Sequence, residues 1–386
     1  MLPLAGIKVL DLGTVLMAPY AGQWLADLGA DVIKVEAPDG DSTRRTGPSH
    51  EPGMAAMFLG LNRNKRSVVL DLKTEAGRED LVKLAETADV LLHNNRPQKM
   101  LALGLGPEAL LARNARLVYA CLHGFAETGP YGGRPAYDDI IQGMCGLASL
   151  VGQAQGSPGY LPTVAADKTC GLVGAIAILA ALTRRGTTGE GGYVEVPMFE
   201  TMVAFTAVEH FYGHHFSPPE APAAYPRVMT PERRPFATRD GHICVLPYTD
   251  RHWAALFAAC GRAELTDDPR FKGIAARTLN ATALYATLGG LLAERTTSEW
   301  LETLQRLEIP CAPITSLEEL EDDPHLTATG FFAEVEAANG ETLRFPGVPV
   351  LFDGERPLIR RPPLLGEHTD EILASLRGSA ASQVAD

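Results

Sequence analysis

The sequence has few positive charges for its length and no cysteine pattern of the metal-binding kind. Lysine and arginine number 34 against 47 aspartates and glutamates, so the formal net charge is −13. This charge disfavours a general nucleic-acid surface, because neutralising phosphates requires clustered cations. The six cysteines form no CxxC pair and have no metal-ligand spacing to the ten histidines. We therefore expect reduced cysteines, no bound metal and a cytoplasmic protein.

A leader pattern and a long membrane-spanning run are also missing. The first 13 residues lack a basic region followed by a long apolar stretch, so we expect neither a signal peptide nor a membrane partner. The apolar stretch from Gly171 to Leu182 is too short to cross a bilayer and is followed by Arg184 and Arg185. We interpret it as a buried helix.

The chain is instead long and ordinary in composition. Its 386 residues are 46% hydrophobic and 21% charged, which is typical of globular proteins. Because single cores stop growing at about 250 to 300 residues, we expect two domains. The segment 214–234 contains five prolines and is the predicted linker. Residues 1–213 precede it, and a smaller α+β domain over 235–325 follows, beginning with a hairpin at Asp240-Gly241.

Strands and helices alternate through the first 122 residues. The pattern predicts strands at 8–12, 31–36, 67–70, 90–93 and 117–122, with helices at about 19–28 and 75–86 between them. A further strand at 192–196 lies between two helices. This alternation favours an α/β protein with a Rossmann-like sheet. A closing helix is expected near the C-terminus, with Thr369 as its N-cap.

A nicotinamide-dependent oxidoreductase is disfavoured even so. Glu36 ends the second strand, as an acidic residue does in dinucleotide-binding folds. The loop before it reads DLGTVLMAP, however, with one glycine where the fingerprint GxGxxG requires three. The backbone of such a loop could not form the tight turn that a pyrophosphate needs.

Basic residues cluster near the carboxyl ends of several predicted strands. They are Arg44, Arg45, Arg63, Lys65, Arg66, Lys73, Arg96 and Lys99. Open α/β sheets bind ligands at that edge, so these side chains are candidates for a phosphorylated ligand. The alternative is that they are solvated loop charges.

Asp167 begins a small-residue turn that leads into the apolar helix. It can be the N-cap of that helix, and it can also be a nucleophile, because helix-end N–H groups stabilise negative charge; the two roles do not exclude each other. Cys170 competes for the second role, but no histidine accompanies it, and we favour core packing. His123 is likewise interpreted as structural rather than as a base.

Seven fragments in order resemble the class III CoA-transferase family, which includes formyl-CoA:oxalate, carnitine and bile-acid CoA-transferases and α-methylacyl-CoA racemase. They are GIKVLDLGTVLMAPYAGQWLADLGADVIKVEAPDGDSTR, LNRNKRSVVLDLKTEAGRED, ADVLLHNNRP, PAYD, the AAD that ends at Asp167, IPCAPITSLEELEDDPHL and PLLGEHTDEIL. The resemblance covers nearly the whole chain.

The resemblance implies a large Rossmann-like domain to which residues 326–386 return, and an interlocked homodimer. It also implies acyl-CoA as a substrate, a carboxylic acid as acceptor and no prosthetic group. The residues that resemble coenzyme contacts by position are Leu16, Met17, Arg44, Leu70, Lys73, Asn94, Asn95, Arg96, Lys99, His123 and Arg134.

The family's chemistry, carried over to this chain, makes Asp167 a covalent nucleophile, with Tyr137 and Asp138 as further catalytic candidates. Succinyl-CoA is a possible donor by the family's habits. Tyr137 stands where the racemase branch has a histidine, which argues against a racemase. Leu16 replaces a glutamine, and TPERRPFATRDG replaces a glycine run, of the oxalate enzymes, which argues against oxalate as acceptor. A racemase and a non-catalytic acyl-CoA-binding protein remain as alternatives.

Overall fold

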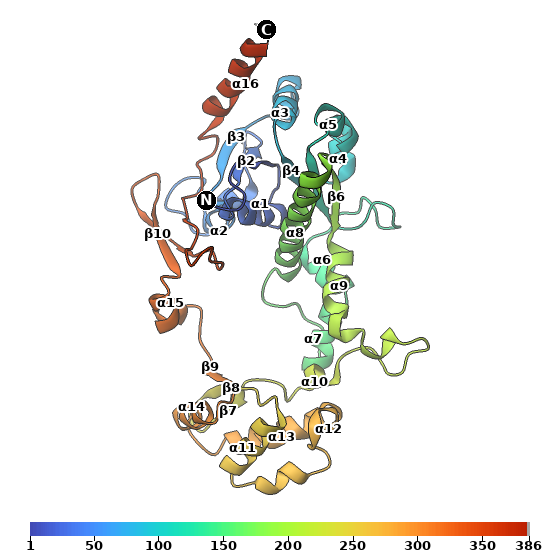
Figure 1. The fold of residues 1–386 in the computed structure, drawn as a ribbon, viewed down its shortest axis with the longest axis vertical. Coiled ribbons are helices and arrows are strands. Elements are labelled where there is room, and N and C mark those ends of the chain that lie inside the picture. Colours follow the sequence, from blue (N-terminus) through green and yellow to red (C-terminus); the bar gives the residue numbers. More distant parts are fainter. Residues whose placement is uncertain (384–386) are drawn as a thin grey trace. The chain divides into compact units, whose positions relative to one another are not determined.

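A computed structural model describes residues 1–383 of the chain, with the side chains of residues 1–376 (Figure 1). The chain divides into two compact units. The first contains Met1–Cys145, Leu161–Phe205 and the chain from Pro324 onward, so both ends of the sequence contribute to it. The second contains Gly146–Tyr160 and Thr206–Asp323. The proline-rich segment 214–234 thus falls within the second unit.

The first unit is built on a six-stranded parallel sheet with the order β3-β2-β1-β4-β5-β6. Its strands are β1 (Lys8–Asp11), β2 (Asp31–Glu36), β3 (Arg66–Val69), β4 (Val90–His93), β5 (Val118–His123) and β6 (Gly192–Pro197). The predicted α/β class and parallel sheet are therefore confirmed. The strand order reverses between β1 and β4, and the carboxyl ends of these two strands form the topological switch point.

Helices cover the sheet, and a hairpin follows near the end of the chain. The helices of the first unit are α1 (Met17–Asp27), η1 (Ser42–Arg45), α2 (Ala56–Asn62), α3 (Glu75–Glu86), α4 (Pro97–Ala102), α5 (Pro107–Arg113), α6 (Asp138–Met144), α8 (Ala165–Thr188), α9 (Met198–His210), α15 (Pro324–Ala328) and α16 (Thr369–Gln383), and its hairpin consists of β10 (Phe332–Glu336) and β11 (Thr342–Pro346). Helix α9 runs on into the second unit.

The two faces of the sheet are covered by different helices. Leu10, Ile33 and Leu91 form one core with residues of α3, α5 and α16, while α8 packs against α1, β5 and β6. Figure 1 shows the last helix, α16, beside the end of β3, and α16 contacts both β3 and α3. Thr369 is the first residue of α16 rather than its N-cap. Its hydroxyl accepts a hydrogen bond from the Val69 N–H of β3 at 3.1 Å.

Helix α8 contains the apolar stretch that the sequence predicted to be a buried helix. Among the described helices it is the one whose length and composition would suffice to cross a membrane. Ala166, Cys170, Gly174 and Ile178 are buried along one side of it. Because this side packs on the sheet and on α1, α8 has the contacts of a core helix.

The second unit combines a small antiparallel sheet with short helices. Its elements are α7 (Leu147–Gln155), η2 (Tyr212–His215), α10 (Pro226–Met229), β7 (Phe236–Ala237), β8 (His242–Val245), α11 (Asp250–Ala259), η3 (Ala263–Asp267), α12 (Gly273–Leu279), α13 (Ala281–Leu292), α14 (Thr297–Arg306), β9 (Cys311–Pro313) and η4 (Glu319–Asp322). The sheet has the order β7-β8-β9. Trp253, Phe257, Leu288 and Trp300 lie in its own hydrophobic core.

Candidate active site

Two loops are joined at the switch point of the large sheet. The loop after β1 and the loop after β4 exchange a pair of hydrogen bonds: the Thr14 N–H donates to Asn94 Oδ1 at 2.9 Å, and Asn94 Nδ2 donates to the Thr14 carbonyl at 2.8 Å. Ligands of open α/β sheets bind at this position. Asn94, which the sequence placed in the coenzyme site, therefore holds one wall of that site against the other.

A buried lysine supports the loop after β1 from below. Lys34 Nζ donates to the Gly13 carbonyl at 2.9 Å and forms an ion pair with Asp41 at 3.0 Å, and both side chains have no solvent exposure. Asp41 also accepts a bond from the Val15 N–H at 3.2 Å. Val15 has a φ of 66°, in the left-handed region that a β-branched residue rarely adopts. The ion pair thus fixes a strained loop at the ligand-binding edge.

A second buried ion pair lies beneath the first turn of α1. Lys65 Nζ is 2.7 Å from Asp11 Oδ2 and donates to the Pro19 carbonyl at 2.7 Å. Burial lowers the pKa of Lys65 to about 8, and the charge of Asp11 opposes a further fall. For Asp41, burial acts to raise the pKa, but Lys34 and two bonds from Thr43 outweigh it, and the pKa lies below its ordinary value.

Several basic residues predicted for the ligand edge are structural instead. The Arg44 guanidinium is buried, donates to Glu36 at 2.8 and 2.6 Å and lies 3.7 Å above the ring of Phe58. Arg63 is buried against Asp27 at 2.7 Å. Because these groups are enclosed by protein partners, they hold segments of the fold together. The predicted coenzyme contact of Arg44 stays a prediction, and its guanidinium is already bonded to Glu36.

Four other cations of the prediction are exposed near the carboxyl edge. Lys73 follows β3, Arg96 and Lys99 follow β4, and Arg134 lies in the segment after β5. Lys99 Nζ donates to Asn95 Oδ1 at 3.2 Å. These side chains are free to meet a phosphate from solvent. Two residues of the predicted site at the start of α1, Leu16 and Met17, are buried, as is Leu70 after β3.

The N-terminus of α8 carries the candidate nucleophile. Asp167 is the third residue of the helix, and the N-cap is Val164, whose side chain makes no capping bond. The N-cap interpretation of Asp167 is therefore wrong. Asp138 supplies a cap from α6 instead, because its Oδ1 accepts from the Asp167 N–H at 2.9 Å. Gln142 Nε2 donates to the other carboxylate oxygen of Asp138 at 2.6 Å.

The electrostatic surroundings of Asp167 are unusual for an aspartate. Burial, together with the negative charge of Asp138, raises the pKa of Asp167 from 3.8 to about 7. A carboxylate of higher basicity is a better nucleophile, and near pH 7 about half of it is ionised. A perturbed acid at a sheet's carboxyl edge is a candidate functional group on physical grounds.

A glycine brings α8 close to the first turn of α1. A Cβ on Gly171 would lie 2.7 Å from the Met17 carbonyl oxygen and 3.1 Å from the ring of Tyr20. Asp167 is one turn before Gly171 and therefore lies on the same side of α8. The N-cap of α1, Leu16, makes no side-chain capping bond. The N–H groups at this helix start are available to stabilise negative charge near Asp167.

The other candidate nucleophile and base are occupied or enclosed. Cys170 is fully buried, and burial together with the charge of Asp167 raises the pKa of its thiol to about 12. His123 Nε2 is 2.9 Å from Glu195 Oε1, and the ring is buried. Tyr137 is 71% exposed, so as the structure stands its hydroxyl is a surface group. Asp167, with its raised pKa, stays the candidate nucleophile of this edge of the sheet.

Comparison with known proteins identifies the kind of enzyme. The model of CoA-transferase family III matches residues 4–369. A probable fatty acyl-CoA transferase of Mycobacterium tuberculosis is 34% identical in an alignment of 385 positions that covers 96% of this chain and 98% of the relative. A succinate–glutarate CoA-transferase of Agrobacterium fabrum is 34% identical in an alignment of 386 positions that covers 97% of this chain and 96% of the relative.

Solved structures agree with the sequence comparison. The crystal structure of an aspartate-to-alanine mutant of the Mycobacterium tuberculosis protein matches with a TM-score of 0.84 at 34% identity, covering 97% of this chain and 99% of that one. A CAIB/BAIF family protein from Brucella suis matches with a TM-score of 0.81 at 34% identity, with coverage of 97% and 99%. The chain belongs to the class III CoA-transferase family.

As a class III CoA-transferase the protein is a transferase whose substrates are CoA thioesters. Within residues 1–383 no group of three or more His, Cys, Asp or Glu side chains could hold a metal ion. The resemblance seen in the sequence is thus confirmed at the level of family and reaction class.

Sequence reasoning missed three side chains that hold the loops and helix starts of the site in place. Lys34 and Lys65 were not recognised as buried, and Gln142 was not recognised as the partner of Asp138. Lys34 did leave a signal: it interrupts DVIKVE, a strand whose last five residues are buried. A lysine in such a strand needs a buried anionic partner, which the sequence alone does not identify.

Proposed function

We propose that this enzyme moves coenzyme A from an acyl-CoA to a free carboxylic acid through covalent intermediates on Asp167. The position of Asp167 carries the proposal. It lies on the first turn of α8, on the side that approaches the start of α1, and its pKa is about 7. A nucleophile there would meet an acyl-CoA bound at the switch point of the sheet.

The proposed reaction exchanges thioester and anhydride bonds. The Asp167 carboxylate attacks the acyl carbon of the donor, CoA leaves as a thiolate, and a mixed anhydride forms. The thiolate then attacks the aspartyl carbon of the anhydride, which releases the donor acid and leaves an aspartyl-CoA thioester. The acceptor carboxylate attacks this thioester to form a second anhydride and free the thiolate, which then attacks the acceptor's acyl carbon and regenerates Asp167.

Helix termini would stabilise the oxyanions of these steps. The uncapped start of α1 at Leu16 and Met17 presents backbone donors beside α8. Asp138 takes the Asp167 N–H and keeps the helix start ordered. We retain Tyr137 as a candidate donor, since a hydroxyl exposed in the free chain can turn toward a bound substrate.

The coenzyme would lie along the carboxyl edge of the sheet. Lys73, Arg96, Lys99 and Arg134 are exposed there and could neutralise its phosphates. Succinyl-CoA is the donor we favour, because relatives at 31 to 34% identity include succinate–glutarate, succinyl-CoA–L-malate and succinyl-CoA:glutarate CoA-transferases.

We further propose that the enzyme works as an interlocked homodimer in the cytoplasm. The outer side of α8 and the middle of α9 expose the apolar residues Leu172, Ile176, Val203 and Phe205, with Ile176 at 64%. Large apolar side chains exposed on two helices support a contact with a second chain. The six free cysteines support a reducing compartment. Sedimentation of the purified chain tests the dimer, and a monomer at micromolar concentration would contradict it.

Trapping the intermediate tests the reaction directly. The enzyme is incubated with succinyl-CoA, treated with hydroxylamine and digested, and the modified peptide is identified by mass. In the wild-type enzyme we expect a hydroxamate at Asp167. In Asp167→Asn we expect neither this modification nor CoA transfer. Modification at Cys170, or none, would refute the mechanism. Solvent deuterium entering the α-carbon without an acceptor acid would indicate a racemase instead.

A further inference from the structure

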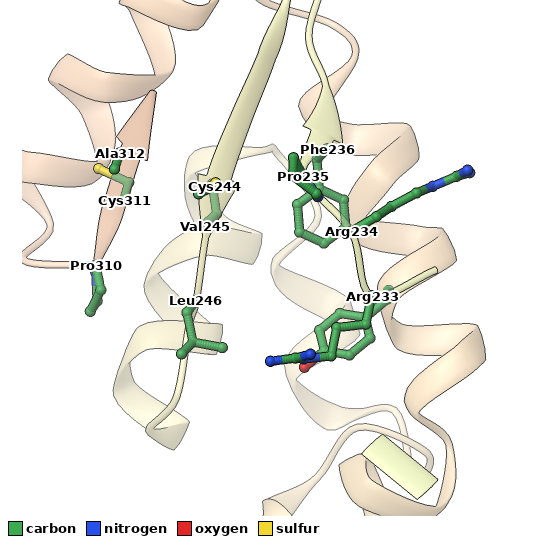
Figure 2. Close-up of a pocket in the computed structure, with 11 residues that line it drawn as sticks. Arg233, Arg234, Pro235, Phe236, Cys244, Val245, Leu246, Pro310, Cys311 and Ala312 are labelled. Atoms are coloured by element: carbon green, nitrogen blue, oxygen red, sulfur yellow. The ribbon is translucent and has the colours of Figure 1, made fainter. Parts of the chain in front are cut away.

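The second unit contains a cavity that the proposed reaction does not use. Its volume is about 500 Å³, within the range of about 300 to 1,000 Å³ common for small-molecule sites. Figure 2 shows the cavity between the end of the proline-rich segment, β8 and the start of β9. The residues that line it are Arg233, Arg234, Pro235, Phe236, Cys244, Val245, Leu246, Tyr285, Pro310, Cys311 and Ala312.

One wall of the cavity is an apolar sheet face. In β8 the alternate residues Ile243 and Val245 are buried in the core of the second unit, so Cys244 and Leu246 face outward. Cys244 is paired with Ala312 of β9. An outward face of an antiparallel sheet usually carries polar residues. Apolar residues at these positions indicate that the face binds something with an apolar body.

A free cation stands at the mouth of this apolar wall. In Figure 2 the guanidinium of Arg233 extends toward Leu246, whereas the side chain of Arg234, which also lines the cavity, extends in the opposite direction. Arg234 has a carboxylate partner, Glu232, at 3.5 Å. No carboxylate among the described residues pairs with Arg233. The cavity therefore combines one uncompensated positive charge with an apolar surface.

A second arginine, Arg227, orients the lining residue Tyr285. Arg227 Nε donates to the Tyr285 hydroxyl oxygen at 3.0 Å, and Tyr285 is buried in the core. The phenol oxygen is thus oriented by a positive group, which increases its capacity to donate its own hydrogen to an anion. Arg233 offers a charge-assisted donor to an anionic ligand group, and Tyr285 is part of the lining.

We infer that this cavity binds an organic acid, whose carboxylate meets Arg233 and whose carbon chain lies on Phe236, Leu246 and Ala312. The site goes beyond the proposed function, since it is formed by the second unit alone and does not depend on acylation of Asp167. A planar guanidinium matches a carboxylate in geometry. Simple inorganic anions would leave the apolar wall uncovered and bind more weakly.

Hexanoate and 1-hexanol are the probes, because they share an apolar chain and differ in charge. Binding is measured by calorimetry or ligand-observed NMR on the full chain carrying Asp167→Asn, so that no turnover occurs. We expect saturable hexanoate binding that Arg233→Gln weakens about fivefold to tenfold. Arg234→Gln is the matched control and should change it less than twofold. 1-Hexanol should bind more weakly than hexanoate, and neither Arg233→Gln nor Arg234→Gln should alter its affinity.

Filling the cavity gives an independent measurement. Ala312 is exposed on the outer face of β9, so Ala312→Leu does not disturb the core and should weaken hexanoate and 1-hexanol alike. The inference is overturned if hexanoate does not saturate, if Arg233→Gln and Arg234→Gln act equally, or if Ala312→Leu has no effect on binding. If Ala312→Leu changes the sedimentation of the chain and leaves hexanoate binding unchanged, the face is a contact between copies of the chain, and the inference of an acid site is overturned as well.

Discussion

Replacing Asp138 by asparagine should move the acid limb of the activity profile to lower pH. The pKa of Asp167 is about 7, roughly three pH units above its ordinary 3.8. Burial is the larger of the two causes, and the charge of Asp138 is the smaller. Removing that charge therefore accounts for less than half of the rise, and we expect a downward displacement of about one pH unit.

The assay is kcat/KM for succinyl-CoA between about pH 5 and pH 9, which reports ionisations of the free enzyme. Asparagine keeps an oxygen that can accept from the Asp167 N–H, but its amide would oppose Gln142 Nε2, at a cost of about 1 to 3 kcal/mol. A smaller folded fraction lowers the whole curve without moving its limb. An acid limb that stays in place, or moves to higher pH, would refute the electrostatic argument.

Gly171→Ala places a Cβ 2.7 Å from the Met17 carbonyl oxygen and should reduce transfer activity and cost about 1 to 3 kcal/mol in urea unfolding. Gly186→Ala in the same helix meets nothing within 4 Å and should preserve activity and stability, so equal losses would contradict the close approach of α8 and α1. The raised pKa of Asp167 lowers the stability of the wild-type chain as pH rises through about 7. At about pH 8.5 Asp167→Asn should therefore unfold at a higher urea concentration than the wild type, with a free energy of unfolding larger by about 1 to 3 kcal/mol. This difference should vanish below pH 3.8. Asn94→Ala breaks the paired bonds at the switch point and should raise the KM for acyl-CoA more than it lowers kcat; an unchanged KM would count against that role.

Much of the large sheet could be predicted from the sequence because its signals are local. The strands at 31–36 and 90–93 and the helix at 75–86 agree with β2, β4 and α3 to the residue. Runs of β-branched and apolar residues bounded by turns predict such strands. The exclusion of a dinucleotide site rested on one loop, and the family assignment supports that reading.

Side-chain partnerships could not be predicted, because they join residues far apart in the chain. The sequence placed Arg44 after the carboxyl end of β2, and the structure has it there. The sequence could not show that the Arg44 guanidinium donates to Glu36. A cap was one of the two interpretations of Asp167, whereas the capping carboxylate comes from Asp138, 29 residues earlier. Burial of a charge depends on its distant partner, and one-dimensional patterns do not contain that information.

The loop after β1 shows how this fold forms a ligand edge without a glycine fingerprint. Val15 adopts a left-handed φ, which costs about 1 to 2 kcal/mol for a residue with a Cβ. A bond from its N–H to the Asp41 carboxylate returns about 1.5 to 3 kcal/mol, as bonds to charged groups do. Asp41 is itself held by Lys34, whose other bond reaches the Gly13 carbonyl. The loop conformation that glycines permit in dinucleotide folds is here imposed by two buried charges, Lys34 in the neighbouring strand β2 and Asp41 in the segment that follows it, so the loop sequence alone does not reveal it.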